Sequence, residues 1–128
     1  MANIYRIDSS ALFLTANISA LGPAASRASI LDLSKTDPSV AVAHSSNATG
    51  DIERLVVSDK VLLKGKRLMV FTKIALIGAN ESTRSTEGDG VTGQYFLDGG
   101  PDGLKAFPET GKDYVDPNVF LTFLIDII

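Results

Sequence analysis

The longest apolar stretch of the chain, residues 67–77, predicts a central β-strand that is covered on both faces. Side chains of a strand alternate between its two faces, and over residues 68–77 Lys73 is the one charged side chain on either face. A buried helix would also give an apolar run of this kind. The β-branched residues within the stretch and the glycines on either side of it favour the strand.

The last ten residues, 119–128, predict a second long strand whose two faces differ in role. One alternate set is wholly apolar and is expected to line the core: Val119, Leu121, Phe123, Ile125 and Ile127. The opposite face carries Phe120, Leu124 and Ile128, and the central stretch presents Met69 and Phe71 in the same way. A two-layer sandwich covers only one face of each sheet, so these five side chains predict an exposed apolar patch of the kind found at interfaces. The alternative is that another segment of the chain, such as residues 20–27, covers them.

The rest of the chain consists of short alternating stretches separated by turn signals. Residues 11–19 alternate regularly, and residues 98–103, which read Asp-Gly-Gly-Pro-Asp-Gly, give the strongest turn signal. Residues 80–90 and 110–118 are predicted to be exposed loops. Many short strands without a convincing long helix predict an all-β fold, a single-domain antiparallel β-sandwich or jelly-roll-like barrel over residues 1–128.

This assignment of faces predicts which side chains form the core. The residues expected to be mostly buried are Leu12, Leu14, Ile30, Leu55, Val57, Leu68, Val70, Ile74, Leu76, Phe96, Leu121, Phe123 and Ile125. A register slip of one residue would turn such a set to the opposite face, so burial tests the assignment directly.

Composition excludes several classes of protein. The net charge of −3 gives no electrostatic reason to expect nucleic acid as a partner. The absence of cysteine excludes disulfides, thiol catalysis and cysteine-rich zinc sites. No apolar stretch is long enough to cross a bilayer as a helix, and residues 1–8 do not resemble a secretory signal. We therefore expect a cytoplasmic protein or one assembled into a particle.

His44 is the one histidine of the chain and the first candidate for catalysis. A histidine that activates a serine also needs an orienting acid and an oxyanion hole, and no residues at suitable spacing supply them. We expect His44 to be a hydrogen-bonded residue in a loop or at a strand end. The sequence thus predicts no enzyme, no catalytic residue and no cofactor.

Acidic turn residues raise the possibility of a calcium site. Calcium needs several converging oxygens, which Asp98 and Asp102 could supply if Asp113 or Asp116 joined them from another loop. Their spacing does not match a helix-loop-helix calcium loop, and turn chemistry explains the same residues.

Two functions remain after this survey of candidate chemistry. The first is a non-enzymatic structural or interaction protein that self-associates into a homo-oligomer or larger assembly. The alternative is a module that binds a sugar, a lipid or calcium through residues 45–51, 80–90 and 110–118, since loops on a rigid scaffold commonly carry binding.

Overall fold

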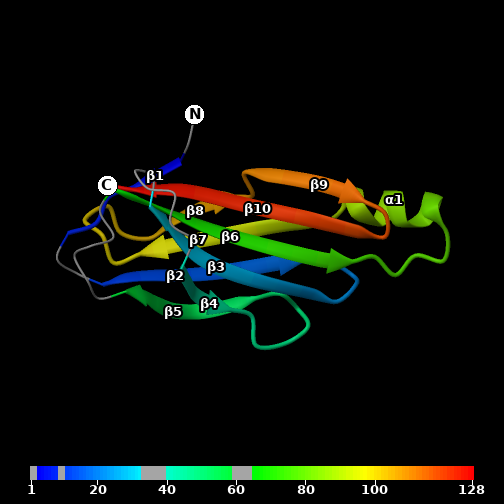
Figure 1. Cartoon of the computed structure of the whole chain (residues 1–128), viewed down its shortest axis with the longest axis horizontal. Helices are drawn as coiled ribbons and strands as arrows, with labels where there is room; N and C mark the ends of the chain where they lie inside the picture. Colours follow the sequence, from blue (N-terminus) through cyan, green and yellow to red (C-terminus); the bar gives the residue numbers. More distant parts are fainter. Residues whose placement is uncertain (1–2, 9–10, 33–39, 59–64) are drawn as a thin grey trace.

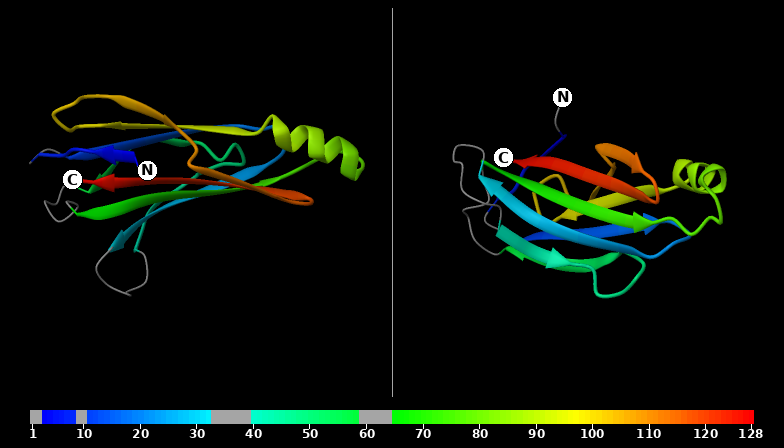
Figure 2. Two further views of the ribbon diagram at one scale, coloured as in Figure 1. Left: turned by 90° about the horizontal axis from the view of Figure 1, so that it is seen from above. Right: turned by 45° about the vertical axis from the view of Figure 1, so that its right-hand side comes forward.

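The protein is an all-β sandwich with one short helix, seen in a computed structural model that describes residues 3–8, 11–32, 40–58 and 65–128 (Figure 1). Six of the described strands form one sheet, in the order β1 (Asn3–Tyr5), β10 (Asn118–Ile127), β6 (Lys66–Ala75), β3 (Ala24–Asp32) and β4 (Val40–His44), with β9 (Gly111–Val115) also paired to β10. Four form the other, in the order β5 (Ile52–Ser58), β2 (Leu12–Ser19), β7 (Thr92–Asp98) and β8 (Lys105–Pro108). Figure 2 shows the two layers and the helix α1 (Glu81–Asp89) at one end.

The centre of the larger sheet is the antiparallel pair β6 and β10, which confirms both long strands predicted from the sequence. The pairing runs from Asn118 opposite Ala75 to Asp126 opposite Arg67. Each strand turns one alternate set of side chains inward, and these sets are buried as predicted: Leu68, Val70, Ile74, Val119, Leu121, Phe123, Ile125 and Ile127. The hydrophobic alternation therefore assigned both faces of these strands correctly.

The core lies between the sheets and agrees with the predicted core in all but one position. Ile30 and Leu55 are partly buried against the core, and the other predicted residues are buried, except Phe96. Phe96 pairs with Thr15 on the outer face of the smaller sheet, so that prediction was wrong. Tyr95 and Leu97 point inward instead, and the Tyr95 ring stacks on Phe123 at 4.5 Å between centroids and 3° between planes.

Residues 80–90 form a helix rather than the expected loop. The Asn80 side chain caps α1 by accepting a hydrogen bond from the Thr83 backbone N–H at 2.9 Å. The helix has almost no apolar residues, so the sequence shows no hydrophobic periodicity of the kind that predicts an amphipathic helix. Its buried residue is Gly88, where a side chain would meet the Tyr114 ring and Val119.

The stretch 110–118 is likewise not a loop, because most of it forms β9 on the edge of β10. That edge is shared, since β9 pairs with the first half of β10 and β1 runs parallel to its end. Thr110 binds the part of this edge between β9 and β1. Its N–H donates to the Thr122 carbonyl at 2.7 Å, and its hydroxyl accepts from the Leu124 N–H at 2.9 Å. The backbone of β10 is thus hydrogen-bonded along this edge.

The buried side chain of Tyr5 ties β1 to the far part of the chain. The Tyr5 hydroxyl donates to the Gly103 carbonyl at 2.7 Å and accepts from the Gly100 N–H at 3.0 Å. Its own carbonyl accepts from the Ile128 N–H, and the Ile7 N–H donates to the Ile128 carbonyl, both at 3.0 Å. Backbone hydrogen bonds therefore join β1 to the end of the chain, and the Tyr5 side chain joins it to residues 100–103.

Candidate functional site

The outer face of the larger sheet carries a contiguous apolar stripe, formed by Met69 and Phe71 of β6 with Phe120 and Leu124 of β10. Met69 lies directly opposite Leu124 in the register, and the rings of Phe71 and Phe120 stack with centroids 5.6 Å apart. The Phe71 side chain is 40% exposed, and the other three are intermediate in exposure. We call these four residues the outer stripe. Four of the five predicted interface residues are thus brought together.

None of the described helices or strands lies over the outer stripe (Figure 2). The candidate cover, residues 20–27, is not available because from Ala24 onward it forms β3, in the plane of the sheet beside β6. The helix α1 lies at the end of the sandwich and packs beside Tyr114 rather than over the sheet face. The stripe is therefore open to solvent in the part of the chain that the structure describes.

Ile128, the fifth predicted residue, is 46% exposed but does not join the outer stripe. Its backbone completes the pairing with residues 5–7. The ion pair of Arg67 and Asp126, with Nε 2.7 Å from Oδ1, lies on the same face between Ile128 and the stripe. The Arg67 side chain is 30% exposed and that of Asp126 is 23% exposed. This ion pair forms a polar border to the apolar surface.

Two further charged residues flank the stripe at Phe120. In the register, Lys73 of β6 lies opposite Phe120 on one side and Asp113 of β9 lies opposite it on the other. Both side chains are exposed, and neither has an ion pair or hydrogen bond among the described residues. Strand spacing of about 4.8 Å places the backbones of the two residues roughly 10 Å apart on either side of the phenylalanine.

Three of the four acidic residues considered for calcium are held by arginines at separate places, so the structure does not bring them together. Asp98 pairs with Arg54 at 2.9 Å and Asp102 with Arg6 at 2.6 Å, each through two hydrogen bonds. Asp116 is held by Arg84 of α1. Over the described ranges, no three histidine, aspartate or glutamate side chains are placed to hold a metal ion.

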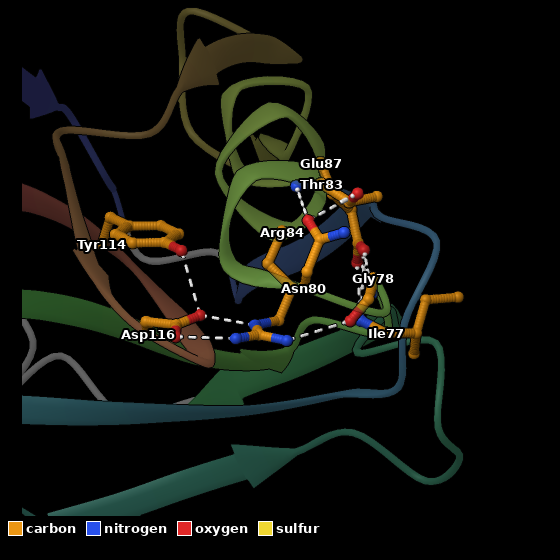
Figure 3. Close-up of polar contacts among 8 residues, drawn as sticks. All are labelled: Ile77, Gly78, Asn80, Thr83, Arg84, Glu87, Tyr114 and Asp116. Carbon is orange, nitrogen blue, oxygen red and sulfur yellow. Dashed lines mark hydrogen bonds and ion pairs between the residues drawn. The ribbon is translucent and has the colours of Figure 1, made fainter.

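Around the start of α1, a polar clasp joins the end of β6 to the β9–β10 turn (Figure 3). Arg84 binds both carboxylate oxygens of Asp116, at 2.6 and 3.0 Å, and donates to the Gly78 carbonyl at 3.1 Å. The Glu87 carboxylate accepts from the backbone N–H groups of Ile77 and Gly78. The charged side chains and backbone groups of the clasp satisfy one another's hydrogen bonds, which indicates that they anchor the helix rather than react with a substrate.

The clasp also sets the electrostatics of this end of the sandwich. The hydrogen bond from Arg84 lowers the pKa of Asp116 below its ordinary value, against a smaller effect of desolvation. Tyr114 donates to the same carboxylate at 3.0 Å, and desolvation followed by this hydrogen bond raises the pKa of Tyr114. Sequence reasoning missed the clasp because it treated residues 80–90 as a loop. The signal that could have found it is Asn80 followed by Thr83, a helix-capping pattern.

Residues 45–51, the loop between β4 and β5, border a shallow hollow of about 480 Å³ on the outer face. The loop is held to β3 by the Ala24 N–H, which donates to the Ala48 carbonyl at 2.7 Å. The floor of the hollow presents Ala25, Ala75 and Lys73. Small-molecule sites usually have several converging polar groups. Lys73 is the charged side chain of this hollow, and Ser45, Ser46 and Asn47 of one loop add polar groups. The ligand-binding alternative therefore stays a prediction.

His44 ends β4, and its side chain is exposed as expected for a strand-end residue. Its ring Nδ1 lies 3.1 Å from the Ser45 carbonyl oxygen, which confirms the predicted hydrogen bond.

No family model, curated protein or solved structure matches this chain. Among the helices that the structure describes, none has the length and apolar character needed to span a membrane.

Proposed function

We propose that the protein is a non-enzymatic structural or interaction protein whose copies associate through the outer stripe. The observation that carries the proposal is the open cluster of Met69, Phe71, Phe120 and Leu124 on the outer face of the central strands. Four large apolar side chains on one sheet face are typical of a contact surface, whereas isolated exposed apolar residues are ordinary.

The position of the stripe on the fold supports this reading. It lies on the two longest strands, whose opposite faces form the core, so its side chains sit on a rigid support. Aromatic residues and methionine are enriched at interfaces, and the stripe contains two of the former and one of the latter. The Arg67–Asp126 pair, Lys73 and Asp113 give it the polar rim that such surfaces have.

The test is the double variant Phe120→Ser/Leu124→Ser, analysed by size-exclusion chromatography with light scattering at micromolar concentration. Truncation of a buried interface anchor costs about 2 kcal/mol or more. Two such losses correspond to a nearly thousandfold weaker contact, so we expect a folded species of lower mass. The matched control is Val56→Ser/Leu104→Ser, which removes two exposed apolar side chains elsewhere on the surface and should leave the mass unchanged.

Circular dichroism and thermal unfolding of each variant separate association from folding. The core-facing side chains of β10 are unchanged in the double variant, so its fold should persist. A wild-type protein that is a clean monomer under these conditions would overturn the proposal. So would a double variant that unfolds without a separable loss of association, because Phe120 and Leu124 would then belong to the folding core.

A further inference from the structure

The register of β6, β10 and β9 points to the orientation in which two copies meet, an inference that rests on the proposed function. We infer that the outer stripes pack face to face about a two-fold axis running along β10. In this arrangement Lys73 of each copy meets Asp113 of the other. A closed two-fold contact uses the same surface on both copies, so the surface must be complementary to itself.

Where β9 pairs with β10, three rows of side chains cross the outer face at right angles to the strands. The first row is Lys73, Phe120 and Asp113, from β6, β10 and β9 in turn. In the second row Phe71 and Gly111 lie on either side of Thr122. The third row, at the end of β9, consists of Ala75, Asn118 and Val115.

A two-fold axis along β10 keeps each row at its own level and exchanges its β6 side with its β9 side. Lys73 then faces Asp113, which pairs a positive with a negative charge. Phe71 faces Gly111, so the largest side chain of its row meets the residue with none. Ala75 faces Val115, which is 58% exposed and gains an apolar partner. All three rows are therefore complementary under one operation.

A two-fold axis that runs across the strands at the level of Phe120 also stacks these faces, and it gives the opposite result. It would place Lys73 against Lys73 and Asp113 against Asp113. Like charges opposed in an interface repel each other, and neither residue has an ion-pair partner among the described residues to offset this. The charges on either side of Phe120 thus select the axis along β10.

Sheet geometry is compatible with these contacts. Stacked sheets lie about 10 Å apart, within the combined reach of a lysine and an aspartate side chain. Twisted sheets cross at roughly 30°, so contacts nearest the axis stay in register while those at the strand ends diverge. The row of Lys73 and Asp113 is centred on Phe120, and the Phe71 row is its neighbour on the same face.

The experiment exchanges the charges one at a time. Lys73→Asp leaves two acidic residues beside Phe120, and Asp113→Lys leaves two basic ones. Each variant alone should self-associate at least about tenfold more weakly than the wild type, because both symmetry-related contacts become repulsive. Mixed at equal concentration, the two variants should form a heterodimer with affinity near that of the wild type. The double variant Lys73→Asp/Asp113→Lys should regain self-association.

Native mass spectrometry distinguishes the heterodimer by mass, and thermal unfolding checks that each variant folds. The pair Lys73→Glu and Asp113→Arg repeats the design should either first variant fail to fold. Single variants that self-associate as tightly as the wild type, or a mixture no tighter than its components, with Phe120→Ser/Leu124→Ser still lowering the mass of the assembly, would overturn this orientation but leave the proposed function intact. An assembly insensitive to both sets of substitutions would overturn both.

Discussion

Replacing Tyr95 by phenylalanine should stabilise the folded protein, although it removes a polar group from the core. The Tyr95 side chain is fully buried, and its hydroxyl has no hydrogen-bond partner among the described residues. The Thr72 hydroxyl lies near enough to the Tyr95 hydroxyl to lower the pKa of Tyr95, but it makes no hydrogen bond of ordinary geometry with it and is paired with the Ser26 hydroxyl at 2.7 Å. Phenylalanine keeps the ring and its stack on Phe123 while removing the unpaired oxygen.

The size of the effect follows from the cost of burying an unpaired polar group, which is about 1–3 kcal/mol. Removing that group should raise the free energy of unfolding by a similar amount. For a domain of this length, 1 kcal/mol corresponds to a shift in Tm of about 4 °C. We therefore expect Tyr95→Phe to melt about 4–12 °C above the wild type near neutral pH.

Alkaline pH should widen the difference between the two proteins. Burial raises the pKa of Tyr95 to about 12 from its ordinary value of 10.0. A group with a raised pKa in the folded state contributes stability that is present below its unfolded pKa and lost as pH rises through the folded value. The wild type should thus lose stability between pH 10 and pH 12 through this residue, and the variant should not.

Urea unfolding of both proteins at pH 7 and pH 11 measures the two effects. A variant less stable than the wild type at pH 7 would refute the reasoning, since it would mean that the hydroxyl is satisfied in solution, for example by a bound water. Equal losses in both proteins at pH 11 would refute the pKa argument alone.

Two further outcomes follow from the same structure. Phe123→Ala should lower the free energy of unfolding by about 3–5 kcal/mol in urea titrations, whereas Phe120→Ala, on the opposite face of β10, should lower it far less. The lowered pKa of Asp116 means that its pair with Arg84 stabilises the fold above the ordinary pKa of 3.8, and that this contribution is lost as pH falls through the folded value. Asp116→Asn should therefore melt below the wild type at pH 6, and the two should converge in melts towards pH 2.

Sequence reasoning succeeded where burial imposes a strict alternation. Every second residue of β10 from Val119 to Ile127 is buried, so its pattern determined both the core and the outer stripe. It erred at Phe96, because β7 has aromatic residues at adjacent positions and hydrophobicity alone does not say which one faces inward. The register with β2 determines which of the two rings faces inward, and this register depends on both paired strands rather than on the sequence of β7 alone.

The helix α1 and the polar clasp could not be read from hydrophobic pattern, because they are built from polar contacts. The helix depends on its Asn80 cap and on Glu87, whose carboxylate binds the backbone N–H groups at the end of β6. The arginine partners of Asp98, Asp102 and Asp116 are 44, 96 and 32 residues away in sequence. Spacing along the chain carries no information about such pairs, so the sequence could not show which carboxylates are held by arginines.

The joining of β1 to β10 has a consequence for how the chain reaches its native state. Tyr5 finds its partner Gly103 at a separation of 98 residues, and the central strand β6 needs β3 before it and β10 after it. Closing such long loops costs entropy before any contact compensates for it, which is why folds dominated by distant pairings form slowly. Until β10 docks, β6 presents an unpaired edge, so partly folded chains are open to strand pairing with one another. The yield of refolding should therefore fall as protein concentration rises, even under conditions in which the native fold is stable.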